Sequence, residues 1–411
     1  MKYFYPDSQD FVDPSFDFET ETRSEVRIRQ QDDQYPHEVF AQPPYDGLLV
    51  SKAIVEDRYT IAQRQRLLRA GVRAFFRLDN RESTRHLKTM GDCGAFQYVK
   101  EKRPPFSVDE VLGFYLDCGF DYGISVDHII LAYEPEYDNK SLDGFDLVPA
   151  GMRERQEITL DLADEFYRKH KREKCKFIPV GVAQGWSPKA YAHSVNCLQK
   201  MGYAYIAMGG VVPLKTADII SSLRKVQTVI NPTTELHLLG VTRCEEMPNF
   251  KNFGVVSFDS TAPLRKAFKD DKDNFFTPTR TYSAVRVPQV QGNPGLERRI
   301  VAGQVDQNYA IRLERRCMLA LKGYDNGTVL LADTIDALQE YEHLHSPGKE
   351  YAGLYRQVLM DKPWRHCDCE ICQRLGIHVI MFRGAERNRR RGFHNLHVFY
   401  RTLQDQVLSQ H

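Results

Sequence analysis

Short apolar runs alternate with longer stretches of helical periodicity between residues 46 and 265, and this alternation limits the fold more than any other feature. Parallel strands separated by helices of ten or more residues connect through right-handed crossovers. Seven or eight such units predict an α/β fold, a (β/α)8 TIM barrel. The alternative is an open doubly wound sheet, but no Gly-rich dinucleotide loop follows the first predicted strand. The predicted strands are 47–51, 72–78, 88–91, 122–131, 176–183, 203–210, 236–241 and 254–259, and the predicted helices are 59–70, 108–118, 152–170, 188–201 and 216–229.

The chain outside the predicted barrel divides by composition. Residues 1–45 are polar and often interrupted by proline, which predicts an irregular N-terminal arm laid over the barrel of residues 46–265. Residues 266–361 begin with a charged loop and then show helical periodicity, so they predict a helical insertion. Residues 362–411 carry clustered cysteines and predict a zinc-binding subdomain. A chain of 411 residues with 42% hydrophobic residues can bury a sizeable core.

The charge balance limits the partners that the chain can have. Lys and Arg number 56 against 55 Asp and Glu, so a nucleic-acid partner requires a local basic face. No apolar stretch approaches the roughly 20 residues that span a bilayer, and the polar start lacks the apolar core of a signal peptide. We therefore expect a cytoplasmic protein without a membrane partner.

The run Val255–Asp259 ends in a carboxylate and is followed by small residues and a proline. A β-branched and aromatic run of this kind predicts a buried parallel strand that delivers Asp259 to a loop. Chemistry in a TIM barrel sits at that end of the strands. The alternative is that Asp259 caps the next helix, but several other predicted strands also end in polar side chains.

Three of the nine cysteines, Cys367, Cys369 and Cys372, lie within six residues, whereas the other six are scattered. Thiols this close rarely satisfy disulfide geometry but can converge on one ion, which predicts a structural zinc site. The fourth ligand is His394 or His397. An iron–sulfur cluster lacks a fourth nearby cysteine.

An arginine-rich run lies between the cysteines and these histidines. It includes four arginines in five residues, which predict a phosphate-binding patch beside the zinc site. The alternative is a solvated charged face. The residues are Arg387, Arg389, Arg390 and Arg391.

Seven segments together resemble the tRNA-guanine transglycosylase family, in the order in which that family carries them. Phe258–Arg265 looks like its nucleophile strand, and Cys-x-Cys-x-x-Cys with His394-Asn-Leu is similar to its zinc motif. The other five segments are 90–97, 124–127, 181–185, 207–210 and 238–241.

The resemblance implies base exchange at an N-glycosidic bond. Asp259 would attack C1′ and form a covalent enzyme–nucleic acid intermediate, and Asp92 would act as general acid and base. The resemblance also implies roles for the substrate-binding residues. Asp127 would accept hydrogen bonds from the guanine-type base, and Gln184 and the Gly210 amide would contact O6. Phe96 would stack on the ring, and Gly209 and Leu239 would line the base pocket.

Two departures from the family pattern narrow the substrate. Lys215 stands where the queuosine-forming enzymes carry a glutamate that suits a cationic base, which predicts an incoming base with a neutral 7-substituent, such as preQ0. The segment Pro263–Phe268 replaces the Arg-rich loop for the tRNA anticodon but retains Arg265 as a nucleic-acid contact. With the insertion and the arm, this favours the branch that places 7-deazaguanine bases in DNA, with accessory DNA-modification proteins as further partners.

Three other readings stay open at this point. The substrate could be tRNA instead of DNA. The barrel could bind nucleic acid through the arginine patch without catalysis. A metal-dependent hydrolase would need His and carboxylate ligands at strand ends, where only His128 and His237 are candidates.

Overall fold

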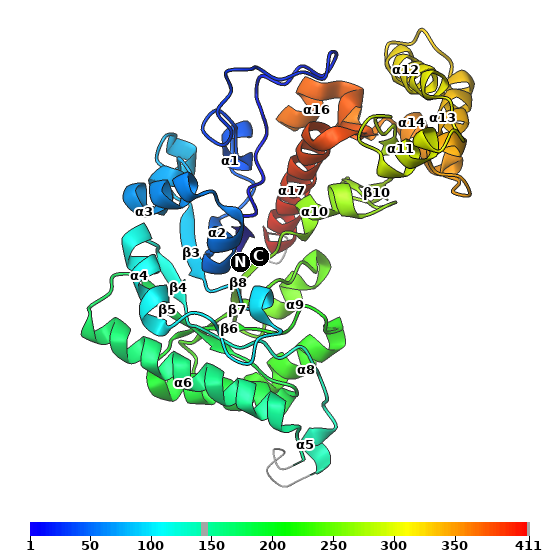
Figure 1. Ribbon diagram of the computed structural model, residues 1–411. Coiled ribbons are helices and arrows are strands. Elements are labelled where there is room, and N and C mark those ends of the chain that lie inside the picture. Colours follow the sequence, from blue (N-terminus) through cyan, green and yellow to red (C-terminus); the bar gives the residue numbers. More distant parts are fainter. Residues whose placement is uncertain (141–146, 409–411) are drawn as a thin grey trace. The chain divides into compact units, whose positions relative to one another are not determined.

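The computed structural model describes residues 1–140 and 147–408. Eight parallel strands form a closed barrel in the order β1 to β8, with helices around its outside (Figure 1). The predicted TIM-barrel class is therefore confirmed. The strands are β1 (Lys2–Pro6), β2 (Gly47–Ser51), β3 (Lys88–Asp92), β4 (Tyr122–Ile124), β5 (Ile178–Ala183), β6 (Tyr205–Met208), β7 (Glu235–Leu238) and β8 (Val255–Asp259).

The chain divides into two compact units, which are described separately. The barrel unit contains residues 1–9, 45–261 and the chain from 403 onward, and the second unit contains residues 10–44 and 262–402. The helices of the barrel unit are α2 (Lys52–Arg58), α3 (Ile61–Phe75), α4 (Val108–Cys118), α5 (Tyr137–Lys140), α6 (Ala150–Arg172), α7 (Pro188–Met201), α8 (Thr216–Val226) and α9 (Met247–Lys251), with short 3-10 turns η1 (Glu82–Thr84), η2 (Ala95–Tyr98) and η3 (Cys244–Glu246).

The barrel strand missing from the sequence-based assignment is β1. Residues 2–6 lie between β2 and β8 and not in an irregular arm. Phe4 points into the barrel interior, while Tyr3 stacks on Phe258 at 5.1 Å between ring centroids. An unbroken aromatic run suits a parallel strand because such a strand is buried on both faces.

The predicted strand at residues 72–78 is wrong, because these residues end α3 and enter a turn. The Thr60 side chain accepts a hydrogen bond from the Gln63 amide, which starts the helix. The helix is interrupted at Gly71, whose φ is +78°, and Val72 and Phe75 are buried in the helical turn that follows, so their apolar spacing reflects helical packing. The other seven predicted strands are found near their predicted positions.

The barrel interior is filled by inward side chains from successive strands, as expected for a packed barrel of this size. These side chains form one hydrophobic cluster of Phe4, Leu49, Met90, Ile124, Val180, Val182, Tyr205 and Ala207. The filled interior leaves the carboxyl ends of the strands as the rim on which polar side chains can gather.

The second unit is mostly helical. Helices α12, α13 and α14 contact one another in sequence, which confirms helical structure in the predicted insertion. Two short strand pairs, β9–β10 and β11–β12, complete the unit. Its elements are α1 (Pro36–Val39), α10 (Ala262–Lys269), β9 (Phe275–Phe276), β10 (Thr281–Tyr282), β11 (Val285–Arg286), α11 (Pro294–Val301), α12 (Gln307–Asp325), α13 (Leu331–His345), α14 (Ala352–Asp361), α15 (Pro363–His366), α16 (Glu370–Leu375), η4 (Gly376–Ile380), β12 (Met381–Phe382) and α17 (Gly384–Leu408), whose last residues belong to the barrel unit.

Candidate active site

Six strands deliver the predicted base-exchange residues to one rim. The carboxyl ends of parallel strands in a closed barrel lie on the same face, so residues far apart in the chain meet there. Asp92 and Asp259 end β3 and β8, Asp127 and Gln184 follow β4 and β5, Gly209 and Gly210 follow β6, and Leu239 follows β7.

Asp92 is surrounded by protein atoms and by other carboxylates. Burial, together with the charges of Asp127 and Asp259, raises its pKa to about 8. The backbone N–H groups of Gly94 and Cys93 oppose this shift without overcoming it. Asp92 and Asp259 are therefore close enough to interact, and Asp92 keeps its proton at neutral pH.

Asp127 accepts a hydrogen bond on each of its two carboxylate oxygens. One oxygen accepts from the Gln184 Nε2 at 2.7 Å, and the other accepts from the Cys93 thiol at 3.1 Å. The hydroxyl of Tyr98 lies 3.0 Å from that sulfur. Burial raises the pKa of Asp127 and these two hydrogen bonds lower it, and the net result is a pKa of about 6. Asp127 is thus mostly ionised at pH 7 and can accept further hydrogen bonds.

Gln184 is held from both ends of its amide. Its Oε1 accepts from the Ile130 N–H at 3.1 Å, and one hydrogen of Nε2 goes to Asp127. The second hydrogen of Nε2 remains for another acceptor. The Gly-Gly turn packs directly on this amide: a Cβ at Gly209 would lie 2.2 Å from Nε2, and Gly210 has a φ of +72°. Glycine is required at both positions.

Asp259 is held through one of its two oxygens. Oδ1 lies 3.1 Å from His237 Nε2 and accepts from the Gly240 N–H at 2.9 Å. This contact is absent from the sequence-based prediction, in which His237 is a candidate metal ligand only. Its position two residues before Leu239 on a predicted strand was the available signal.

The two apolar residues predicted to contact the base differ in exposure. Phe96 lies on η2 and is 51% exposed, so its ring face is open to a stacking partner. Leu239 is partly buried and packs on the cluster inside the barrel. A phenylalanine exposed to this extent, four residues after Asp92 in the chain, does not serve only the core.

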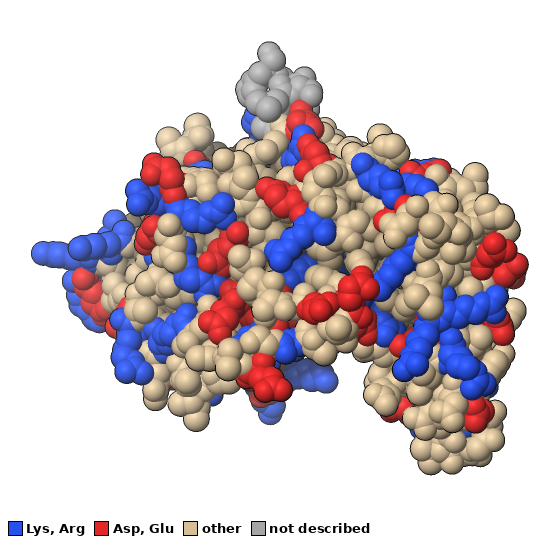
Figure 2. Space-filling model, turned by 90° about the horizontal axis from the view of Figure 1, so that it is seen from above, with Lys and Arg blue, Asp and Glu red and all other residues tan. Residues whose placement is uncertain are grey.

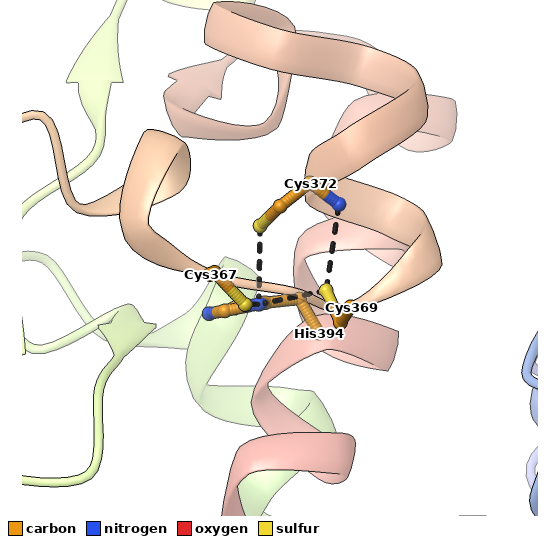
Figure 3. A group of neighbouring side chains, drawn as sticks. All are labelled: Cys367, Cys369, Cys372 and His394. Carbon is orange, nitrogen blue, oxygen red and sulfur yellow. Dashed lines mark hydrogen bonds between the residues drawn. The ribbon is translucent and has the colours of Figure 1, made fainter.

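Four side chains of the second unit form a group that could hold a metal ion. The ligand atoms of Cys367, Cys369, Cys372 and His394 all lie within 4.8 Å of one another (Figure 3). His394 Nδ1 lies 3.6, 3.4 and 3.3 Å from the three sulfur atoms, taken in chain order. Tetrahedral zinc, with bonds of about 2.3 Å to sulfur and about 2.0 Å to nitrogen, separates such atoms by about 3.5 Å. The donor set and its spacing therefore fit zinc.

The other histidine candidate is directed elsewhere. His397 packs on Phe40 with ring centroids 4.8 Å apart, and it is not in the cysteine group. His394, in contrast, bonds through Nε2 to the Phe276 carbonyl at 2.8 Å. Such a contact orients a ligating imidazole and leaves Nδ1 for the ion.

The predicted arginine patch is not found on the surface. Arg387, Arg390 and Arg391 are 1%, 4% and 0% exposed. Arg387 pairs with Glu21, and Arg390 bonds to Glu386 at 2.6 Å. The arginine-rich run instead holds the segment 10–44 against α17 inside the second unit. These three side chains are buried and cannot contact a phosphate backbone in this arrangement: Arg387 and Arg390 pair with carboxylates, whereas Arg391 donates to backbone carbonyls such as that of Met381.

Two other arginines predicted to contact nucleic acid, one from the patch and one from the segment 263–268, keep some contact with solvent. Arg265 is exposed on α10, and Arg389 is half-buried with its guanidinium 5.8 Å from the Phe11 ring centroid. On the face shown in Figure 2, positive and negative side chains are interspersed. This agrees with the near-zero net charge.

The hydrolase reading finds no support. His128 is buried, and its ring nitrogens lie 3.1 Å from the Lys102 carbonyl and 2.8 Å from Arg155. Within residues 1–140 and 147–408, the group around His394 is the one that could hold a metal ion.

In that same part of the chain, none of the helices combines the length and the apolar character needed to cross a bilayer.

Comparison with known proteins gives one informative result. No protein-family model matches the chain. A DNA-guanine transglycosylase from Salmonella montevideo is 51% identical over 414 residues, which cover 98% of this chain and 97% of that protein. An identity of this size over nearly both full lengths shows the family. The chain therefore belongs to the DNA-guanine transglycosylase family, whose members are pentosyltransferases.

Proposed function

We propose that this chain replaces guanine in DNA by a 7-deazaguanine base through a covalent aspartyl intermediate. The observation that carries the proposal is the pairing of two carboxyl groups at one rim: Asp92, whose pKa is raised to about 8 by burial and neighbouring charges, and Asp259, whose charge acts on Asp92 and whose Oδ1 is held by His237 and Gly240. Displacement at a glycosidic carbon needs one nucleophile and one acid in the same site. The DNA-guanine transglycosylase that is 51% identical supports DNA as the substrate.

The first step frees guanine. A carboxylate oxygen of Asp259 attacks C1′ of the nucleotide, the bond from C1′ to N9 breaks, and its electron pair leaves with the base. Asp92 gives its proton to the departing base, so neutral guanine is released. The target nucleotide must first leave the duplex stack, because C1′ and the base edge are otherwise out of reach.

The second step inserts the new base. Asp92, now ionised, takes the proton from N9 of the incoming base, and that nitrogen attacks C1′. The ester to Asp259 breaks and its carboxylate is regenerated. Both carboxyl groups return to their starting protonation states, so no other reactant is consumed.

The other rim residues fit recognition of a guanine-type edge. Asp127 would accept from N1–H and the 2-amino group, and the free hydrogen of Gln184 Nε2 and the Gly210 amide would reach O6. Phe96 would stack on the ring, while Gly209 and Leu239 would line the pocket. Each proposed contact pairs a donor with an acceptor, as selection of a buried base requires.

Lys215 bears on the choice of incoming base. It is exposed at the start of α8, after the Gly-Gly turn. A cation there would repel an aminomethyl substituent, so we propose a neutral 7-substituent such as that of preQ0. Competition between the nitrile and aminomethyl bases tests this, and preferential use of the aminomethyl base would refute it.

For the metal centre we propose structural Zn2+. Three thiolates and one imidazole close the coordination shell, so the ion would brace the second unit without taking part in base exchange. Arg265 and Arg389 are the proposed contacts to the nucleic-acid backbone.

The decisive test is to trap the intermediate. Wild-type protein is incubated with a guanine-containing DNA strand without incoming base and then run on a denaturing gel. We expect a covalent adduct with DNA and none with the Asp259→Asn variant, which still binds the strand. A tRNA of matched length serves as the second arm. An adduct with tRNA but not with DNA would overturn the choice of substrate, and none with either would overturn the mechanism.

A further inference from the structure

A chain of buried hydroxyl and imidazole groups runs through the barrel interior to Asp259. His237 on β7 is the register partner of Ser257 on β8, and its Nδ1 lies 2.6 Å from the Ser257 Oγ. Ser257 is hydrogen-bonded in turn to the hydroxyl of Tyr205 on β6. His237 and Ser257 are both 0% exposed. Side chains two positions apart on a strand share a face, so Ser257 and Asp259 both point inward.

The partners fix the direction of these hydrogen bonds. Asp259 Oδ1 already accepts from the Gly240 N–H, and as an acceptor it pairs with a hydrogen on His237 Nε2. With one hydrogen on the ring, Nδ1 accepts, and the Ser257 hydroxyl donates to it. Tyr205 in turn donates to the Ser257 oxygen. The tautomer of His237 is thus set by two hydroxyl groups that do not touch Asp259.

Both donors to Asp259 bind the same oxygen. The Gly240 N–H and His237 Nε2 meet at Oδ1, at 2.9 and 3.1 Å. Among the described residues, no hydrogen bond reaches Oδ2. Since attack on C1′ needs an uncommitted lone pair, the two oxygens have separate tasks: Oδ1 anchors the carboxylate and Oδ2 is free to react.

We propose that His237 is a positioning residue, which fixes the rotation of the Asp259 carboxylate and presents Oδ2 to C1′, with Ser257 and Tyr205 holding its tautomer. This rests on the proposed role of Asp259 as the nucleophile. His237 acts on adduct formation through Asp259 and makes no contact with the base edge, which Asp127 and Gln184 would read.

The test measures the single-turnover rate of adduct formation with a guanine-containing DNA strand. His237→Leu removes the donor, and we expect adduct formation about 10- to 100-fold slower, the usual effect of misplacing a reacting group. His237→Gln restores an amide N–H near the position of Nε2 and should recover much of the rate. Affinity for the strand and KM for the incoming base should stay unchanged in both variants.

Ser257→Ala tests the relay without touching Asp259. It removes the donor to Nδ1, so His237 can turn to the wrong tautomer, and we expect the rate to fall several-fold. A matched control is Ser222→Ala on α8, which removes another buried serine hydroxyl that lies 3.2 Å from a tyrosine hydroxyl, that of Tyr133. The control should keep the wild-type rate.

The outcomes separate the two proposals. Adduct formation by the wild type but not by Asp259→Asn supports Asp259 as the nucleophile. If His237→Leu, His237→Gln and Ser257→Ala then all react at the wild-type rate, the positioning role of His237 is overturned and the nucleophile stands. If the wild type forms no adduct, both fail. Thermal unfolding of each variant checks folding, and if His237→Leu does not fold, a wild-type rate in Ser257→Ala alone overturns the role.

Discussion

Asp92→Asn should abolish base exchange and, at the same time, make the barrel unit more stable than in the wild type, by a margin that grows as the pH rises. The pKa of Asp92 is about 8 in the folded protein against an ordinary value of 3.8. Between these values the folded state holds a proton that the unfolded chain has released. The free energy of unfolding of the wild type therefore falls with rising pH, and this contribution is absent from Asp92→Asn.

The size of the effect follows from one proton. Each pH unit inside this window changes the unfolding free energy by about 1.4 kcal/mol. From pH 5.5 to 7.5 the stability gap between Asp92→Asn and the wild type should widen by about 2 to 3 kcal/mol in favour of the variant. Because Asp92 interacts with Asp127, whose pKa is about 6, we expect the gap to widen by about 2 kcal/mol, the lower end of this range.

Urea denaturation followed by tryptophan fluorescence measures this gap. Trp186 is buried in the barrel unit and Trp364 in the second unit, so a Trp364→Phe background reports on the barrel alone. The control is Asp117→Asn, which changes an exposed carboxylate on α4 and should run parallel to the wild type. A constant gap between Asp92→Asn and the wild type from pH 5.5 to 7.5 would refute the reasoning, and the general-acid role with it.

Three further outcomes are expected. The kcat/KM of base exchange should be bell-shaped, rising through about pH 6 as Asp127 ionises and falling through about pH 8 as Asp92 loses its proton; a flat profile would contradict these roles. Gly209→Ala places a Cβ 2.2 Å from Gln184 Nε2, so KM for the base should rise at least about tenfold, and an unchanged KM would argue against the Gln184 contact. Cys372→Ser should lose bound zinc in elemental analysis and lower the unfolding temperature, whereas full zinc content would exclude this thiol as a ligand.

Most of the fold could be predicted because its signals are local. The bounds of α4 and α7 agree with the predicted helices at both ends, where Ser107 and Ser187 cap the first turn and glycine follows the last. The strand β1 could not be found this way. It is five residues long in a polar segment, and its pairing with β8 is a contact between the two ends of the barrel sequence.

The candidate site could be predicted as a set of strand ends but not as a hydrogen-bonded arrangement. The sequence motifs place Asp92, Asp127 and Asp259 at the ends of predicted strands, which predicts that they meet at one rim of the barrel. The link from His237 to Asp259 depends on strand register, which the sequence does not reveal. The arginine run misled for a similar reason: a charge is exposed or buried according to partners such as Glu21, which lie hundreds of residues away.

The place of β1 between β2 and β8 has a consequence for how the chain is made. The first strand leaves the ribosome long before residues 255–259 exist, so one edge of the growing sheet stays unpaired throughout synthesis of the barrel. During that time the aromatic side chain of Tyr3 lacks its later neighbour Phe258. A nascent chain in this state exposes the unpaired backbone edge of β1, which favours aggregation. The yield of folded protein in cells should therefore depend on the concentration of chaperones.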